Sequence, residues 1–276
     1  MMRLLAIGEC MLELAPAGDG LFRAGFAGDT FNTAWYARRL AGHEVEVAFL
    51  SAIGDDDASA RLEAFVRGAG IVPEFARHPD RTIGLYMITL REGERSFGYW
   101  RGQSAARRLA ENLGAVERLV AGDLAYFSGI TLAILSDDGR AALLETLARA
   151  RSRGVTIAFD PNLRPRLWPS VEGMRAGIEA GAAVADIALP SFEDEVTHFG
   201  DASPDACAAR YAAAGARSIA VKDGPNPVLV IDGTHRVQVV PERVAAVVDS
   251  TAAGDAFNAA FLLGLPQGAA AAARAG

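Results

Sequence analysis

Near its C-terminal end the sequence reads Val248-Asp249-Ser250-Thr251-Ala252-Ala253-Gly254-Asp255-Ala256-Phe257. Small residues end a polar segment there, and an apolar run to Leu265 begins directly after Asp255. Small residues that lead into a helix leave several backbone N–H groups exposed, and the helix dipole adds positive potential. The stretch therefore predicts an anion-binding pocket with the Asp255 carboxylate at its edge, placed to accept a proton. The alternative is an ordinary capped helix with Asp in its first turn.

Short apolar runs alternate with amphipathic segments through most of the 276 residues. The predicted strands are 4–7, 45–50, 124–127, 155–159, 187–189 and 219–221, and the predicted helices are 30–40, 58–69, 137–153, 171–183, 205–213 and 253–265. Alternation of this kind predicts an α/β fold in which a mostly parallel central sheet is covered by helices on both faces, a three-layer α/β/α arrangement.

The segment from Asp249 to Asp255 resembles the Asp-Thr-Thr-Gly-Ala-Gly-Asp signature of the ribokinase-like (pfkB-type) carbohydrate kinases. The resemblance implies that Asp255 is the catalytic base, with no need for a raised pKa, and that Ala252, Ala253 and Gly254 form the anion hole. Ala252 stands where the family more usually has Gly, so a positive φ here would strain the backbone. Other matching segments extend the resemblance over nearly the whole chain, and it implies the ribokinase-like fold.

Composition limits the classes of function. Hydrophobic residues make up 51% and charged residues 22% of the sequence, which is typical of a soluble globular protein with a large core. The net charge of −7 argues against a nucleic-acid partner. Two cysteines, Cys10 and Cys207, lack metal or redox spacing and favour a reducing, cytoplasmic compartment. The sequence has no run of about 18 apolar residues, so we expect no membrane span.

One region departs from the α/β rhythm. Residues 82–101 alternate with period two and turn at Glu92-Gly93, which predicts a β-hairpin outside the parallel sheet. With 8–26 and Val72–Phe75 it would build a small sheet, and the resemblance implies a lid over the sugar, formed by segments at about 8–26 and 72–103 of a single domain, 1–276. A peripheral hairpin without function is the alternative. The apolar face and edge of the hairpin also predict a homodimer or higher homo-oligomer formed through the lid.

Family members usually continue past the catalytic helix with a further helical segment that helps to wall the adenine pocket. This sequence ends at Gly276, partway into what resembles that segment. We therefore expect a C-terminus that is truncated relative to the family, and an incomplete wall on the nucleotide side.

Residues 26–34 resemble the family's first signature, Gly-Gly-x-x-x-Asn-x-Ala. Gly28 would let a ligand approach the backbone, and Asp29 and Asn32 lie near a helix start with groups that bind sugar hydroxyls. Simple N-capping by Asp29 or Thr30 is the alternative. For Asn32 we favour the sugar contact, because an amide within a helix has little structural reason to be there.

Tyr99 and Arg101 share one face of a predicted strand, and Tyr86 on the partner strand can join them. An aromatic hydroxyl beside a guanidinium suits a ligand that carries both hydroxyls and a carboxylate. Arg164 is a second cation near the predicted site. Burying two guanidinium groups near one ligand is unfavourable unless an anion meets them. A surface Tyr–Arg pair is the alternative for Tyr99 and Arg101.

Polar residues follow the predicted strand 155–159 and are held by Pro161 and Pro165. Ligands of α/β sheets gather at the carboxyl ends of strands, so Asn162 and Arg164 are candidates for the ATP side of the site. Arg164 is positioned to meet an anion, either a phosphate or a substrate carboxylate.

Two further segments resemble family motifs on the nucleotide side. Ser191 takes the place of the Asn in the family's Asn-x-x-Glu motif, which is linked to Mg²⁺ and phosphate, and Asp194 takes the place of its Glu. Lys222 and Gly224 resemble the Lys-x-Gly nucleotide-binding loop, although the bare pattern is only a turn. A charged helix N-terminus is the alternative for the acidic residues near Asp194.

These segments, together with Gly8-Glu9-Cys10-Met11, look like the 2-keto-3-deoxygluconate kinase branch of the family. The resemblance implies transfer of the ATP γ-phosphoryl group, as the Mg²⁺ complex, to the 6-hydroxyl of that sugar acid to give 2-keto-3-deoxy-6-phosphogluconate. A fructokinase or ribokinase of the same fold is one alternative, and a non-catalytic sugar-binding protein on this scaffold is another.

Overall fold

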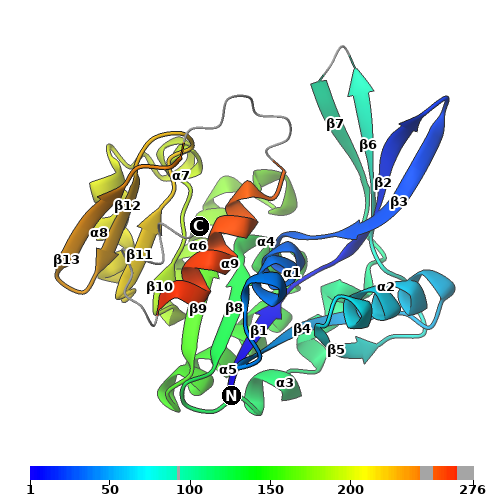
Figure 1. The fold of residues 1–276 in the computed structure, drawn as a ribbon, viewed down its shortest axis with the longest axis horizontal. Coiled ribbons are helices and arrows are strands. Elements are labelled where there is room, and N and C mark those ends of the chain that lie inside the picture. Colours follow the sequence, from blue (N-terminus) through cyan, green and yellow to red (C-terminus); the bar gives the residue numbers. More distant parts are fainter. Residues whose placement is uncertain (92–93, 243–250, 266–276) are drawn as a thin grey trace.

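The computed structural model describes residues 1–91, 94–242 and 251–265, and over these residues its main feature is a nine-stranded sheet (Figure 1). The strand order is β13-β12-β11-β10-β9-β8-β1-β4-β5. The bounds are β1 Met2–Ile7, β4 Val45–Ile53, β5 Val72–Arg77, β8 Leu124–Ser128, β9 Thr156–Asp160, β10 Ile187–Ala188, β11 Ser218–Val221, β12 Val228–Asp232 and β13 His235–Val239. The seven strands from β11 to β5 in this order pair in parallel. Strands β12 and β13 extend the sheet in antiparallel pairing, so the mostly parallel sheet is confirmed.

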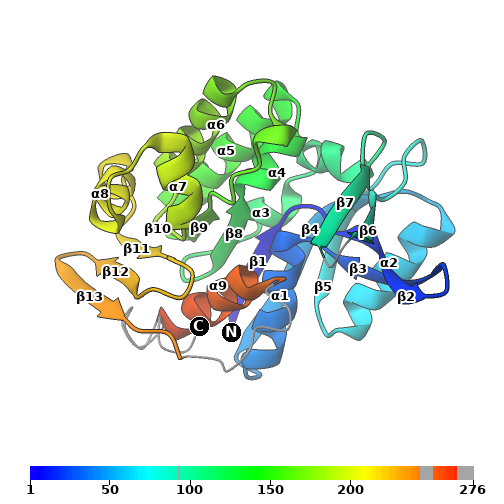
Figure 2. The same cartoon turned by 90° about the horizontal axis from the view of Figure 1, so that it is seen from above.

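Helices cover both faces of this sheet, as Figure 2 shows from above. One layer holds α1 Asp29–Leu40, α2 Asp57–Gly68 and α9 Ala253–Gly264. The opposite layer holds α3 Gly114–Glu117, α4 Gly129–Ile134, α5 Asp137–Ser152, α6 Val171–Val184, α7 Phe192–Phe199 and α8 Pro204–Ala214, with the 3-10 turns η1 Ala105–Glu111 and η2 Pro165–Leu167. The three-layer prediction is confirmed. Among the described residues, no helix is both long and apolar enough to cross a membrane.

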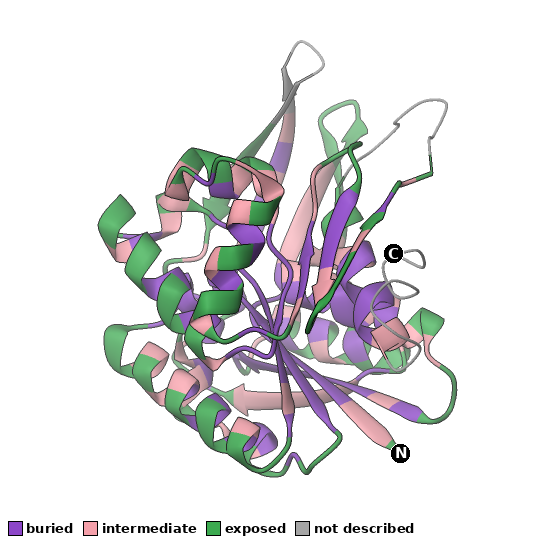
Figure 3. Cartoon of the chain, turned by 90° about the vertical axis from the view of Figure 1, so that its left-hand side faces the viewer, coloured by how far each residue is buried: buried purple, intermediate pink, exposed green. Residues whose placement is uncertain are grey.

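The strands are apolar along their length because both faces are covered. Phe49 and Leu50 are neighbours in β4 but belong to different apolar clusters, one on each face of the sheet. Successive side chains of a strand point to opposite faces, so each strand contributes to both clusters. Figure 3 shows the result, a buried central sheet between helices whose outer faces are exposed.

A second, four-stranded sheet stands apart from the first, on the right in Figure 1. It has the order β3-β2-β6-β7, with β2 Met11–Gly18, β3 Leu21–Ala27, β6 Leu85–Arg91 and β7 Glu94–Trp100. The predicted hairpin is confirmed by the antiparallel pairing of β6 with β7, while its turn, Glu92-Gly93, lies outside the described residues. The prediction that Val72–Phe75 joins this small sheet is wrong, because β5 pairs in parallel with β4 at the edge of the main sheet.

The two sheets meet where β1 leaves the main sheet and α1 begins. Gly28 precedes α1 in an extended conformation, and a Cβ atom there would lie only 2.0 Å from the Glu9 carbonyl oxygen. The space that a side chain at Gly28 would need is therefore filled by the Glu9 backbone. The backbone of Gly28 itself lines a cleft, and its contact with a ligand stays a prediction. The close approach of Glu9 to Gly28 fixes the start of α1 against the segment that leads into the small sheet.

We expect Gly28→Ala to lower the free energy of unfolding by about 1–3 kcal/mol, because the added methyl group forces one backbone segment away from the other. Urea denaturation monitored by circular dichroism measures this change. Gly68→Ala is the matched control, since a Cβ atom there would meet no other atom within 4 Å and the control should lose no stability. Equal stability of the two variants would contradict the role of this contact.

Candidate active site

The predicted site residues come together in one cleft with a volume of about 1790 Å³, between the small sheet and the carboxyl edge of the main sheet. Its lining contains each of them: Gly28, Asp29, Asn32, Tyr86, Tyr99, Arg101, Asn162, Arg164, Ser191, Asp194, Lys222, Gly224, Ala252, Ala253, Gly254 and Asp255. These residues come from segments that lie far apart in the sequence, so the cleft is a product of the tertiary fold.

The N-terminal end of α9 opens onto this cleft. Ala252 has φ 61° and ψ 12°, the left-handed conformation, so the strain predicted for an Ala at this position is present. Such a conformation costs about 1–2 kcal/mol in a residue with a Cβ atom. The Ala252 side chain offers no cap, and the first-turn N–H groups of α9 therefore face the cleft as an anion-binding end. Val248 to Ser250 lie outside the described residues.

Asp255, in the first turn of α9, is held by Asn32 of α1, whose Nδ2 donates to the Asp255 Oδ2 at 2.9 Å. Burial is the largest cause that raises the pKa of Asp255, to about 7, and the nearby Asp29 and Asp160 carboxylates raise it further. The Asn32 hydrogen bond and the Lys222 ammonium act in the opposite direction. The pKa of Asp255 is thus close to neutral pH, although the resemblance did not require a raised pKa.

Asn32 and Asp29 form hydrogen bonds with other residues of the protein at the floor of the cleft. Besides Asp255, Asn32 contacts the backbone N–H of Gly28, which donates to its Oδ1 at 3.4 Å. Asn162 Nδ2 donates to the Asp29 carboxylate at 2.9 Å, so a residue assigned to ATP and one assigned to sugar are direct neighbours. Burial raises the pKa of Asp29. Asn32 therefore orients the candidate base, and its contact with sugar stays a prediction.

Tyr86 and Tyr99 stand opposite each other on β6 and β7, with ring centroids 6.0 Å apart. Tyr86 donates a hydrogen bond to the Glu13 carboxylate. The Arg101 guanidinium carbon lies 5.9 Å from the Tyr99 ring centroid, as expected for residues on one face. The small sheet thus brings two aromatic rings and a guanidinium to the upper wall of the cleft.

Arg101 is paired with Glu9, a buried carboxylate that also accepts a hydrogen bond from Ser104. The protein itself therefore supplies an anion to Arg101, whereas the sequence analysis had expected this anion to come from a ligand. Arg101 Nε is buried and has no hydrogen-bond partner among the described residues. The guanidinium is thus held in place with donor capacity remaining.

The nucleotide-side candidates also lie together. Ser191 and Lys222 form a β-bridge, and the Phe192 N–H donates to the Lys222 carbonyl at 2.7 Å. Arg164 is half exposed, with its Nη1 3.6 Å from the Asp194 Oδ2. Burial raises the pKa of Asp194, and the Asp160 carboxylate adds to this effect. The Arg164 guanidinium acts in the opposite direction and more strongly than Asp160 does. A carboxylate that lines the cleft is nevertheless a ligand type that suits a cation such as Mg²⁺.

Sequence reasoning did not single out a buried polar network beneath the cleft. Asn258 Nδ2 donates to the Asp160 Oδ2 at 2.7 Å and to the Tyr126 hydroxyl at 3.1 Å, and Lys222 joins the same group. Two signals were available. Asp160 directly follows the buried residues of a strand, and Asn258 lies three residues after Asp255, on the same face of α9.

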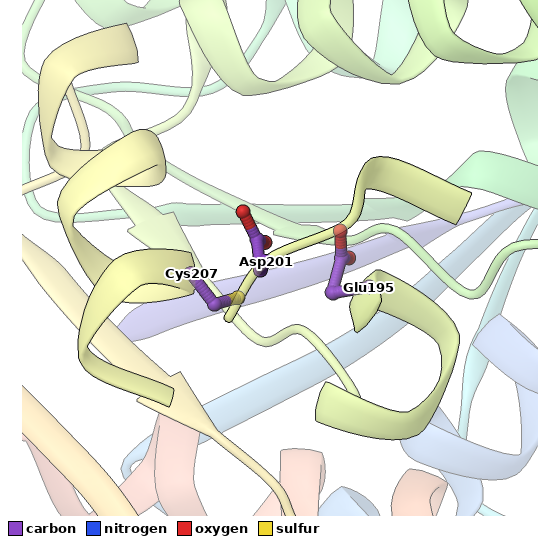
Figure 4. A group of neighbouring side chains, drawn as sticks. All are labelled: Glu195, Asp201 and Cys207. Atoms are coloured by element: carbon purple, nitrogen blue, oxygen red, sulfur yellow. The ribbon is translucent and has the colours of Figure 1, made fainter. Parts of the chain in front are cut away.

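A second acidic group, Glu195, Asp201 and Cys207, lies away from the cleft lining between α7 and α8 (Figure 4). Arg210 Nη2 lies 2.5 Å from Glu195 Oε2 and 2.7 Å from Asp201 Oδ2, and the Tyr211 hydroxyl donates to Glu195 at 2.8 Å. Burial raises the pKa of Glu195 to about 7. The guanidinium balances these carboxylates, so the group is explained as an ion-paired contact between two helices.

Comparison with known proteins agrees with the resemblance to carbohydrate kinases that the sequence motifs indicated. The family model of the pfkB family carbohydrate kinases matches residues 1–275. A 2-dehydro-3-deoxygluconokinase from Dickeya dadantii is 38% identical over 265 residues, covering 93% of this chain and 85% of that protein. A fructokinase from Vibrio alginolyticus is 27% identical, covering 92% of this chain and 81% of the fructokinase. The crystal structure of a fructokinase with bound ATP from Xylella fastidiosa has a TM-score of 0.82 and 26% identity, covering 98% of this chain and 84% of that one. The chain belongs to the pfkB family of carbohydrate kinases.

Proposed function

We propose that the protein is an ATP-dependent kinase that phosphorylates the 6-hydroxyl of 2-keto-3-deoxygluconate, also called 2-dehydro-3-deoxygluconate. The observation that carries this proposal is the Asp255 carboxylate, held by Asn32 at the N-terminal end of α9 and facing a large cleft. The greater identity to a kinase named for this sugar acid than to a fructokinase supports the choice of substrate.

Phosphoryl transfer requires positioning and charge stabilisation more than covalent chemistry by the protein. The sugar 6-hydroxyl attacks the γ-phosphorus, the bond to the ADP oxygen breaks, and Asp255 takes the hydroxyl proton. The N–H groups of Ala252 to Asp255 stabilise the charge on the transferring group. A non-catalytic sugar-binding role is disfavoured, because such a protein would have no use for a base held at an anion-binding helix end.

Mg²⁺ would enter with ATP, and its chemistry is to neutralise charge on the phosphate oxygens. Asp194 would hold it, directly or through water, because its carboxylate lines the cleft. Its ion pair with the half-exposed Arg164, at 3.6 Å, would have to open when the cation binds. Arg164 and the Ser191–Lys222 bridge would position the phosphates on the same side. Asn162 would complete this side through its contact with Asp29.

We expect kcat/KM for the sugar to rise with pH through about 7, where Asp255 loses its proton. Below this pH the carboxyl group is protonated and cannot accept the hydroxyl proton, so the rate should fall about tenfold per pH unit. A coupled ADP-release assay at saturating ATP gives this profile. The charged groups that face Asp255 are Asp29 from α1, Asp160 from β9 and Lys222 after β11.

Asp255→Asn keeps the shape of the side chain but removes the base. Its kcat should fall about 10²-fold or more, with sugar binding largely retained. A wild-type profile that stays flat between about pH 5.5 and 8, or a variant within a few-fold of wild type, would contradict the assignment.

The Arg101 guanidinium is the group we expect to bind the substrate carboxylate. Charge-assisted hydrogen bonds of this kind contribute roughly 1.5–3 kcal/mol. Arg101→Ala should therefore raise KM for 2-keto-3-deoxygluconate by about tenfold to a hundredfold, with a smaller effect on any neutral sugar. Initial rates across a panel of acid and neutral sugars measure the difference.

The Arg101→Ala variant also leaves Glu9 without its ionic partner, which could repel a sugar acid by itself. The double variant Glu9→Gln/Arg101→Ala removes that carboxylate and should still bind the acid weakly. Recovery in the double variant, equal losses for acid and neutral sugars, or a wild-type preference for fructose or ribose would contradict the carboxylate contact.

The small sheet also supports a proposal about assembly. Leu21, Phe22, Phe97 and Trp100 on its outer strands β3 and β7 are exposed, the last to 59%. Exposed apolar side chains on edge strands favour pairing with a second copy of the chain. We expect analytical ultracentrifugation to show a dimer at micromolar concentration, and Trp100→Lys to shift it towards monomer. A wild-type monomer would refute this assembly and leave the kinase proposal unaffected.

A further inference from the structure

Lys222 occupies an unusual position in both the sequence and the structure. It is the only lysine of the sequence, which has 27 Lys and Arg residues in total. Its side chain is 14% exposed and lines the cleft after β11. A methyl group on Gly254, within the predicted anion hole, would lie 3.8 Å from the Lys222 Nζ. The only lysine ammonium group of the protein thus lies next to the first turn of α9.

Two residues hold this ammonium in place. Lys222 Nζ lies 3.3 Å from the Asp160 Oδ2 and 3.1 Å from the Asn258 Oδ1. Asn258 is fully buried and also donates to Asp160, which closes a triangle of contacts. Within the described part of the chain these are the hydrogen-bond partners of the ammonium. Because an ammonium group has three N–H donors, one remains for a ligand.

The charge around the ammonium points in the same direction. Asp29, Asp160 and Asp255 all contribute negative potential at the cleft floor, and Lys222 offsets part of it at Asp255. A phosphoryl group that approaches α9 brings more negative charge into this partly buried region. The helix N–H groups supply partial charges only, whereas Lys222 supplies a full one. Lysine also places this charge in a compact group that fits beside the backbone, unlike the planar guanidinium of arginine.

We propose that the remaining N–H of the Lys222 ammonium binds an oxygen of the transferring phosphoryl group, which makes Lys222 a catalytic residue together with the N-terminal end of α9. Asp160 and Asn258 are positioning residues that aim this N–H. Lys222 forms no covalent bond and keeps its proton through the step. The proposal rests on the proposed kinase function and adds a role for the side chain, beyond the backbone of the Lys222–Gly224 loop.

Lys222→Met should lower kcat about 10²-fold, the loss expected when one preorganised donor to the transition state is removed. The KM for sugar should change little. Since Met leaves Asp160 unpaired, the double variant Asp160→Asn/Lys222→Met removes the whole buried pair. If Lys222 served only as the counter-charge of Asp160, the double variant would recover wild-type rates and refute the proposal. We expect it to fold like wild type in thermal unfolding and to stay slow.

The pH profile distinguishes the direct contact from a second explanation, in which Lys222 acts only by lowering the pKa of Asp255. Removal of Lys222 takes away a charge that lowers the pKa of Asp255, so the acid limb should move to higher pH. If tuning of Asp255 were the whole role, the Lys222→Met rate would return to the wild-type value well above that limb. A deficit that persists on the alkaline plateau supports the direct contact, and full recovery there overturns it.

The single lysine allows a direct measurement without turnover. In full-length protein labelled with [¹³Cε]-lysine, one side-chain methylene signal is expected in NMR spectra. ADP with Mg²⁺ and aluminium fluoride, a mimic of the transferring phosphoryl group, should shift this signal, while ADP with Mg²⁺ alone should shift it much less. Equal shifts would overturn the proposal. Absence of turnover with every sugar would instead refute the kinase function. The two failures can be told apart, because the NMR measurement needs no sugar.

Discussion

The floor of the cleft holds three carboxylates, the buried Asp160 and the half-buried Asp29 and Asp255, and the rest of the site depends on how their charge is balanced. Burial of like charges is strongly unfavourable unless each group is hydrogen-bonded or paired. Here each carboxylate has a different partner: Asn162 for Asp29, Lys222 with Asn258 for Asp160, and Asn32 for Asp255. Two of the three rely chiefly on neutral amides, which bind a carboxylate without cancelling its charge. Partial burial and then the negative potential that remains raise the pKa of Asp255, which is what a general base at neutral pH requires.

The amides also have a mechanical role. Asn32 lies on α1 and Asn258 on α9, helices that run side by side on one face of the sheet (Figure 1). Each amide connects its helix to another element, Asn32 to α9 through Asp255, and Asn258 to the middle of β8 through Tyr126 and to the end of β9 through Asp160. A shift of α9 relative to the sheet would therefore break several hydrogen bonds at once. The base and the anion-binding helix end share one rigid support.

Charge is also balanced within the protein in the upper wall of the cleft, here by an ion pair between Glu9 and Arg101. Glu9 and Arg101 neutralise each other, and Ser104 satisfies a second oxygen of Glu9. The pair lets a guanidinium remain in the small sheet without a ligand, since an unpaired buried charge would be unfavourable. Glu9 is held close to Gly28, so the charge of the upper wall and the start of α1 are set by the same short segment.

Much of the fold could be predicted because the signals are local. The period of apolar residues gave strands and helices such as β8 and α5 close to their observed bounds, and the alternation between them indicates a parallel sheet. The assignment of Val72–Phe75 to the small sheet failed because the residues of β5 are half-buried, a pattern shared by the edge of a parallel sheet and by a strand of a small open sheet. The pairing partner decides between these, and it lies elsewhere in the chain. The antiparallel strands β12 and β13 were missed as well.

By itself the sequence determined the kind of fold, the resemblance to one kinase family and the residues that line the cleft. Only the tertiary structure decided what those residues bind within the protein: Arg101 to Glu9, Asn32 to Asp255, and Asn162 to Asp29. It also brought Asp160, Lys222 and Asn258 into one network. The reason is physical, because secondary structure and motifs follow from neighbouring residues, whereas hydrogen bonds and electrostatic potentials depend on the positions of groups that the chain separates by many residues.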